Sequence, residues 1–188
     1  AQLKADDLPV VVGAGAIGLS AVAALSRREI EPIIVSDFNA ERRALAATFG
    51  AHIQVDPAHE SPFDVWRRVA AEHGGAPPPP VFECVGAAGL VQQIIDETEF
   101  GSRIFVAGGW YSGDSVDCTA ATRQGVTIQF GGGPQPEDWY GTLDAVLDGS
   151  LDPLPSIGRV IGLDDVPAAL DQTRRSEGPP RIVVHPNG

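Results

Sequence analysis

The stretch Pro9-Val10-Val11-Val12-Gly13-Ala14-Gly15-Ala16-Ile17-Gly18 decides the fold of this chain of 188 residues. A short apolar run ends at glycine, as expected for a parallel strand that is buried on both faces. Three glycines follow with the spacing GxGxxG, and the Ala- and Leu-rich residues 17–28 then predict a helix. A strand, a glycine turn and a helix in this order are the context that a dinucleotide-binding fingerprint requires.

Each glycine of this turn has a separate physical role. Gly13 permits the tight turn, Gly15 lets the backbone approach a pyrophosphate, and Gly18 lets the helix pack closely on the strand. The backbone N–H groups near Ala16 and Ile17 point toward the bound anion, and the helix dipole adds to the attraction. The sequence therefore predicts a pyrophosphate site at this turn.

A second mark of a coenzyme site is Asp37, which follows the second apolar run. It lies about 20 residues beyond Gly18, the spacing of the acid that hydrogen-bonds the adenosine ribose. A carboxylate there accepts from both ribose hydroxyls and repels a 2′-phosphate, so the sequence favours NAD over NADP. The alternative is a turn-forming or helix-capping aspartate in front of Asn39, and one side chain can fill both roles.

Helix and strand signals alternate along most of the chain. Strands are predicted at residues 9–12, 33–35, 52–55, 81–85, 103–107 and 126–130, and helices at 17–28, 40–49, 62–73, 90–96 and 136–148. This alternation predicts an α/β fold: a doubly wound, parallel, six-stranded Rossmann sheet with a C-terminal helix-strand tail. We expect residues 1–150 to form an NAD-binding domain and residues 151–188 a separate C-terminal segment.

Composition disfavours several classes of partner. With 43% hydrophobic and 20% charged residues, the chain can bury a normal core. Its 13 basic residues against 25 acids give a net charge of −12, which opposes binding to nucleic acids and anionic membranes. No apolar run approaches the roughly 20 residues that span a bilayer, and no signal peptide opens the chain. A small molecule is the expected partner.

Cysteine and histidine usage predicts neither a disulfide nor a metal site in this chain. Cys84 and Cys118 form no close pair, which suits a reducing, cytoplasmic compartment. Cys84 is interpreted as a small apolar wall residue, because no histidine or oxyanion motif supports a catalytic thiol. The histidines lack metal-ligand spacing and are His52, His59, His73 and His185.

Several segments in their order resemble one family, the medium-chain, zinc-type alcohol and polyol dehydrogenases. They are VVVGAGAIGLSAV (10–22), VSDFNAERRALAATFGA (35–51), VFECVGAAG (81–89), GSRIFVAGG (101–109), VTIQFGGG (126–133), residues 143–173 and RIVVHP (181–186). The resemblance covers nearly the whole chain. The GxGxxG–Asp pair is common among Rossmann proteins, whereas the closing order, with its leucine–aspartate–aspartate at 163–165, is more particular to this family.

The resemblance implies a coenzyme role for residues along the strand ends. Asp37 and Asn39 would hold the adenine ribose with Arg42 beside them, and Arg181 would face the pyrophosphate. The residues implied along the pyrophosphate are Gly15, Ala16 and Ile17. Those implied at the nicotinamide and its carboxamide are Cys84, Val85, Gly86, Ala107, Gly108 and Phe130.

The departures from the family pattern are equally informative. Family members usually carry an N-terminal GroES-like domain that supplies the catalytic zinc ligands, and here the sequence begins just before the first Rossmann strand. The resemblance therefore implies a domain fragment with no catalytic residues of its own, whose tail would pack toward a missing catalytic domain. In the intact enzyme, hydride would pass between an alcohol or polyol and NAD. It also implies a homodimer through the coenzyme domain, for which Ser115–Cys118 is a candidate edge strand.

Three other classes compete with this hypothesis. A short-chain dehydrogenase needs a Tyr-x-x-x-Lys pair, and the only lysine is Lys4, so that class is excluded. A zinc-less quinone reductase tends to use NADPH, which Asp37 disfavours. A non-catalytic NAD-sensing or regulatory module with a Rossmann fold remains as the alternative.

Overall fold

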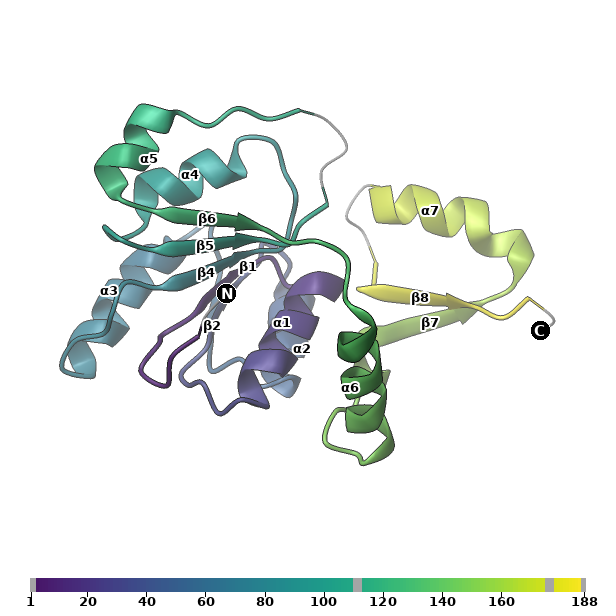
Figure 1. Cartoon of the computed structure of the whole chain (residues 1–188). Coiled ribbons are helices and arrows are strands. Elements are labelled where there is room, and N and C mark those ends of the chain that lie inside the picture. Colours follow the sequence, from purple (N-terminus) through teal and green to yellow (C-terminus); the bar gives the residue numbers. More distant parts are fainter. Residues whose placement is uncertain (1–2, 110–112, 175–177, 187–188) are drawn as a thin grey trace.

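A six-stranded parallel sheet forms the main body of the chain (Figure 1). The structure is a computed structural model that describes residues 3–109, 113–174 and 178–186. Its strands are β1 (Val10–Val12), β2 (Ile34–Ser36), β3 (Ile53–Val55), β4 (Pro80–Glu83), β5 (Arg103–Val106) and β6 (Thr127–Phe130). The helices between them are α1 (Ala16–Ser26), α2 (Ala40–Thr48), α3 (Pro62–Glu72), α4 (Leu90–Glu97) and α5 (Cys118–Gln124).

The strand order β3-β2-β1-β4-β5-β6 places β1 at the centre of the sheet. At its carboxyl end Val12 pairs with Ser36 of β2 on one side and with Glu83 of β4 on the other. The chain continues outward from β1 in one direction and then returns to start again at β4. Ligands of such sheets bind at this reversal, beyond the carboxyl ends of the strands. The predicted doubly wound, six-stranded α/β sheet is therefore confirmed.

Two apolar clusters cover the two faces of the sheet. Because side chains alternate along a strand, Val10 belongs to the cluster under α3 and α4, and Val11 to the cluster under α1. Trp66 of α3 fixes the first cluster, since its indole N–H donates to the carbonyl of Leu8 at 2.9 Å. No helix in the described part of the chain is long and apolar enough to cross a membrane.

The candidate edge strand at Ser115–Cys118 is wrong. Residues 115–117 form no strand, and Cys118 begins α5. The carboxylate of Asp117 accepts from the N–H groups of Thr119 and Ala120, and so caps the helix. An aspartate two or three residues before unpaired N–H groups stabilises a helix start, which decides the local structure against a strand.

The C-terminal segment forms a unit beside the sheet (Figure 1). Within residues 151–186 lie the short helices η1 (Leu154–Ser156) and η2 (Leu163–Asp165), β7 (Ile157–Ile161), α7 (Val166–Arg174) and β8 (Arg181–Val184). The helix α6 (Pro136–Leu147) precedes this segment, and we call the two together the C-terminal unit. β7 and β8 pair in parallel as a separate two-stranded sheet. The predicted helix-strand tail is confirmed, and the structure adds the strand β7, which the sequence analysis did not predict.

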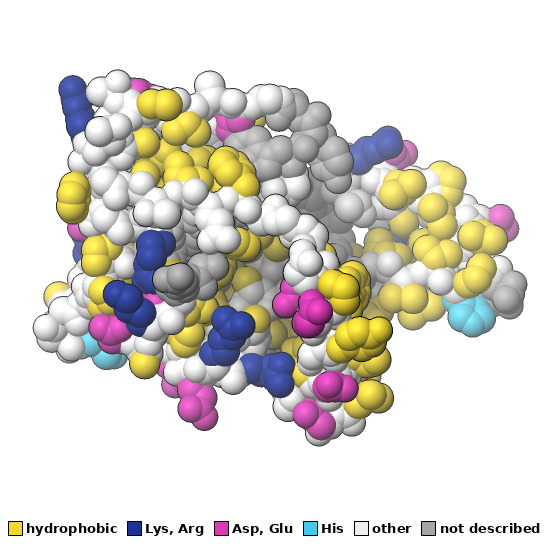
Figure 2. Space-filling view, in the orientation of Figure 1, with side chains coloured by type: hydrophobic (Ala, Val, Ile, Leu, Met, Phe, Trp, Pro, Cys, Tyr) yellow, Lys and Arg dark blue, Asp and Glu magenta, His cyan; other side chains and the backbone are white. Residues whose placement is uncertain are grey.

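Large apolar side chains remain exposed on this unit. Figure 2 shows them gathered on the C-terminal lobe and along the helix below it. They are Trp139, Tyr140, Leu143, Val146, Leu147, Leu154, Val160, Leu163, Leu170, Val183 and Val184. Isolated chains rarely expose so much contiguous apolar surface, so this surface is typical of one that packs against another domain or chain.

Candidate coenzyme-binding site

The three glycines of the turn after β1 differ sharply in what surrounds them. Gly13 has a φ of +94°, and a Cβ there would lie 2.5 Å from Cγ2 of Val85. A Cβ on Gly18 would lie 1.8 Å from the carbonyl oxygen of Gly13, so a side chain there requires the backbone to move. At Gly13 a side chain is strained by the positive φ and collides with the side chain of Val85. A Cβ on Gly15 would meet nothing within 4 Å. The fold itself requires Gly13 and Gly18, whereas Gly15 faces open space that a ligand can occupy.

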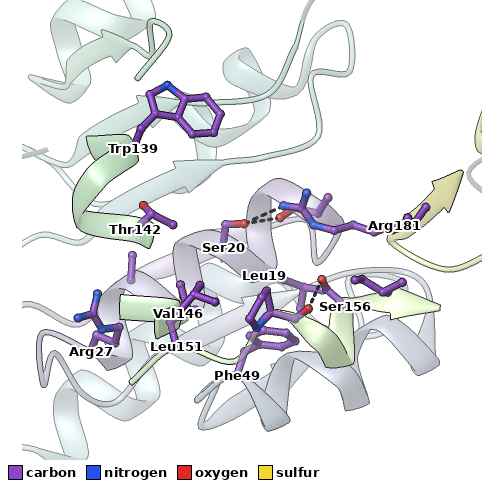
Figure 3. Close-up of a pocket in the computed structure, with 16 residues that line it drawn as sticks. Leu19, Ser20, Arg27, Phe49, Trp139, Thr142, Val146, Leu151, Ser156 and Arg181 are labelled. Carbon is purple, nitrogen blue, oxygen red and sulfur yellow. Dashed lines mark hydrogen bonds between the residues drawn. The ribbon is translucent and has the colours of Figure 1, made fainter. Parts of the chain in front are cut away.

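The N-terminus of α1 presents unpaired N–H groups to that space. Gly15 is the N-cap residue, and no side chain caps the helix. Arg181, the first residue of β8, donates from its guanidinium to the hydroxyl of Ser20 at 3.3 Å. Figure 3 shows these two side chains pointing toward one another beside α1. Helix N–H groups and a guanidinium near the same helix end form the combination that attracts a diphosphate.

Asp37 lies directly after β2 and binds the glycine turn. Its Oδ2 accepts from the N–H of Ala14 at 2.8 Å, and its Oδ1 accepts from the N–H of Asn39 at 2.8 Å. The cap of α2 is Asn39, whose Oδ1 accepts from the N–H groups of Glu41 and Arg42. The helix-capping role considered for Asp37 therefore belongs to Asn39. Each oxygen of Asp37 keeps a further lone pair for another donor.

A cavity of about 530 Å³ opens beside Asp37, where the chain leaves β1, β2 and β4. Phe38 and Val85 expose 75% and 51% of their surface, and both line it. Further lining residues are Asn39, Arg42, Pro57, Pro62, Phe63, Ala87, Ala88, Leu90, Gln93 and Glu97. We call this cavity the adenosine pocket, because adenosine is the ligand that we propose for it. The side chain of Val85, for which the resemblance implied a place at the nicotinamide, lies over Gly13 and lines the same cavity as Asp37.

A second cavity, of about 540 Å³, lies at the carboxyl ends of β5 and β6. It brings together Ala107, Gly108 and Phe130, for which the resemblance implied a role at the carboxamide. Gly86 lies against it, since a Cβ on Gly108 would be 2.3 Å from the N of Gly86. The site thus has two ends, one at Asp37 and one at Gly108, with the glycine turn on the central strand β1 between them.

Comparison of the sequence with known proteins identifies the family of this chain. A sequence profile described as zinc-binding dehydrogenase matches residues 16–148. The chain belongs to the zinc-binding dehydrogenase family.

Individual relatives agree with the family assignment. An L-arabinitol 4-dehydrogenase of Aureobasidium melanogenum is 29% identical over 133 residues, which cover 69% of this chain and 36% of that protein. An L-threonine 3-dehydrogenase of Rhizobium rhizogenes is 28% identical over 166 residues, covering 88% of this chain and 47% of that protein. The chain therefore spans about half the length, or less, of these curated relatives. They are dehydrogenases, and nothing in them favours the regulatory alternative.

A solved structure is similar over the full chain. The crystal structure of 2R,3R-butanediol dehydrogenase from Bacillus subtilis matches with a TM-score of 0.78 and 25% identity, covering 100% of this chain and 53% of that one. The similarity extends over both the sheet and the C-terminal segment. The arrangement of the two units therefore occurs in a solved dehydrogenase.

Because the family is described as zinc-binding, groups of side chains that could hold a metal ion are relevant. In residues 3–109, 113–174 and 178–186, no group of three or more His, Cys, Asp or Glu side chains is placed to hold a metal ion. Cys84 is buried against the α1 face of the sheet, and Cys118 is exposed at the start of α5.

Glu83 is a residue of the site that the sequence analysis missed. It ends β4 and is 0% exposed. Its Oε1 accepts from the N–H groups of Val85 and Gly86, both at 2.7 Å. Its backbone carbonyl accepts from Ala107 and Gly108 at 2.8 and 2.9 Å. One residue thus holds the loops after β4 and β5 together. The available signal was an acid inside the apolar run VFECV.

Cys84 behaves as the apolar wall residue that the sequence predicted. It is 7% exposed, and burial, with a smaller contribution from the charge of Glu83, raises the pKa of its thiol to about 12. The thiolate is the nucleophilic form of cysteine, so a thiol with this pKa is unreactive near neutral pH.

Thiol labelling checks this environment. In the folded chain at pH 8, a maleimide should modify Cys118 and leave Cys84 intact, and raising the pH to about 10 should not expose Cys84 to the reagent. Mass spectrometry of the digested protein locates the label, and a urea-unfolded sample is the control in which both residues react. Rapid labelling of Cys84 in a folded Cys118→Ser variant would contradict the burial described here.

Proposed function

We propose that this chain is the NAD-binding part of a dehydrogenase that moves hydride between an alcohol or polyol and NAD. The observation that carries the proposal is the position of Asp37, between an open glycine turn and an apolar cavity. A carboxylate with spare acceptor capacity suits the two hydroxyls of a ribose. The membership of the zinc-binding dehydrogenase family supports the same conclusion.

The coenzyme is proposed to lie across the carboxyl ends of the strands. Its diphosphate would contact the N-terminus of α1 at Gly15 and the guanidinium of Arg181, and its ribose would bind Asp37. The adenine would enter the adenosine pocket between Phe38 and Val85, whose exposed apolar surfaces suit a flat base. The nicotinamide would then extend toward Gly108, where backbone groups of Ala107, Gly108 and Phe130 line the second cavity.

The chemistry of the intact enzyme is proposed to be shared between two domains. Zinc, when bound, would supply a Lewis acid that polarises the alcohol oxygen, and we propose that its ligands come from a catalytic domain outside residues 1–188. The residues of this chain would bind the dinucleotide, orient its nicotinamide and exclude NADP through Asp37. Orientation of this kind lowers the barrier only when the activating group is also present.

The exposed apolar surface of the C-terminal unit supports a partner domain. We propose that residues 151–188, together with α6, pack against the catalytic domain, which would cover side chains such as Trp139 and Leu147. A homodimer through the coenzyme domain is proposed at β6, which lies at one end of the sheet order. The two free cysteines suit a reducing, cytoplasmic compartment.

Coenzyme preference tests the role of Asp37. We expect NADH to bind at least about tenfold more tightly than NADPH, a difference of about 1.4 kcal/mol, because a 2′-phosphate would lie against the carboxylate. Asp37→Ala should weaken NADH binding more than NADPH binding and so narrow the difference. Titration calorimetry measures both affinities, and equal or tighter binding of NADPH by the unmodified chain would contradict this assignment.

Substitution of two glycines separates binding from folding. Gly15→Val places a side chain in the open space before α1, so the fold should persist while NADH affinity falls more than about tenfold. Gly18→Val should instead destabilise the fold, because its side chain collides with the carbonyl of Gly13. Urea unfolding and NADH fluorescence compare the two variants. Normal NADH affinity in a folded Gly15→Val protein would place the diphosphate elsewhere.

The chain alone is expected to oxidise no alcohol. Residues 1–188 would bind the coenzyme weakly and supply no group that activates the substrate, with or without added zinc. NADH absorbance with a panel of primary, secondary and polyol substrates provides the measurement. The control is the same panel with a full-length relative, and zinc-dependent turnover by this chain would show that the active site has been misplaced.

A further inference from the structure

The α4 side of the adenosine pocket carries a polar pair, Gln93 and Glu97. They lie one turn apart on the same helix, and both line the cavity that Asp37 lines from the end of β2. Between this pair and Asp37, the walls of the pocket are largely apolar and include Phe38 and Val85. A ligand held at Asp37 and filling this cavity therefore brings one of its edges to the pair.

Hydrogen bonds among its neighbours favour one orientation of the exposed Gln93 amide. Nε2 of Gln93 donates to Oε1 of Glu97 at 2.8 Å, and the hydroxyl of Ser61 donates to Oε2 of Glu97 at 2.7 Å. A carboxylate can only accept, so the amide must turn its nitrogen toward Glu97. Ser61 is itself the N-cap residue of α3, where its Oγ accepts from Phe63. Two helices thus hold the amide so that its carbonyl oxygen is directed away from Glu97.

We propose that Gln93, oriented by Glu97, recognises the amino group of adenine and makes the site selective for adenine over hypoxanthine. The inference rests on the proposed function, because ribose binding at Asp37 is what directs a purine into this cavity. The amide offers a carbonyl acceptor and its second N–H, the pattern that pairs glutamine with adenine. Hypoxanthine carries an oxygen where adenine carries the amino group, so the amide carbonyl would face another acceptor.

The carboxylate of Glu97 prevents the amide of Gln93 from turning to bind hypoxanthine. An isolated glutamine can rotate its amide by half a turn and donate to the oxygen of hypoxanthine. Here that rotation would place the carbonyl oxygen of Gln93 against the carboxylate of Glu97, and the hydrogen bond between them would be lost. Selectivity therefore depends on Glu97 as a positioning residue, although Gln93 makes the contact.

Binding of two dinucleotides to the chain tests the proposal. NADH and reduced nicotinamide hypoxanthine dinucleotide differ only at the base, and both fluoresce through the nicotinamide. We expect NADH to bind about five- to tenfold more tightly. Its adenine amino group donates to the carbonyl of Gln93, whereas the oxygen of hypoxanthine would face that carbonyl without a hydrogen bond. Gln93→Leu should bring the two affinities within about twofold by weakening NADH.

The isosteric variant Glu97→Gln separates positioning from direct contact. It lets the amide of Gln93 rotate, so the hypoxanthine dinucleotide should bind more tightly than to the unmodified chain while NADH binding changes less. Gln172→Leu, on α7 and outside the adenosine pocket, is the matched control and should leave the ratio unchanged. Circular dichroism confirms the fold of each variant.

These measurements distinguish failure of the inference about Gln93 from failure of the proposed function. If the unmodified chain binds both dinucleotides equally, the inference is overturned and the proposed function stands. Retention of the full preference in Gln93→Leu also overturns it, since another group would then discriminate between the bases. If NADH does not bind at all, the proposed function is wrong, and the inference that rests on it is wrong as well.

Discussion

The close contact between Gly18 of α1 and the carbonyl of Gly13 is the constraint on which the rest of the site depends. No Cβ fits at Gly18, so the helix lies directly against the end of β1. That contact sets the N-terminus of α1 at the carboxyl edge of the central strand and leaves Gly15 facing open space. Val85, packed over Gly13, extends the same contact to the loop after β4. The proposed diphosphate site and the adenosine pocket both depend on this close contact between α1 and β1.

Two carboxylates then hold the remaining loops in place around that contact. The carboxylate of Asp37 joins the end of β2 to the glycine turn through Ala14, and the carboxylate of Glu83 holds the loop after β4. The backbone carbonyl of Glu83 accepts from the loop after β5. Both act on backbone N–H groups, so they fix the path of the chain regardless of neighbouring side chains. A buried N–H without an acceptor costs about 1–3 kcal/mol, which gives these loops a strong preference for the observed path. The binding surface is therefore organised before any coenzyme arrives.

The sequence predicted the elements whose signal is local and missed those that depend on tertiary contacts. The grouping of Ala107, Gly108 and Phe130 was implied by the family resemblance, whereas the turn at Gly13 and the parallel sheet follow from patterns within short segments. The placement of Val85 does not, because it depends on how the loop after β4 meets the turn after β1. Similarly, α5 is decided by a cap at Asp117, which alternating polarity does not reveal. The role of Glu83 requires knowing which N–H groups surround it.

The net charge of −12 would repel a dianionic coenzyme at long range, but the groups close to the proposed diphosphate site favour an anion. Exposed charges are screened over about 8–10 Å at physiological ionic strength, so the distant acids contribute little at the diphosphate. The groups within reach are the N–H groups of α1 and the guanidinium of Arg181, all of which favour an anion. Asp37 binds the turn through the N–H of Ala14, and in the proposed complex a ribose hydroxyl would donate to this carboxylate, whereas a 2′-phosphate would be repelled by it. In the proposed complex, affinity for the diphosphate and rejection of the extra phosphate of NADPH would thus arise from groups of opposite charge near the same glycine turn.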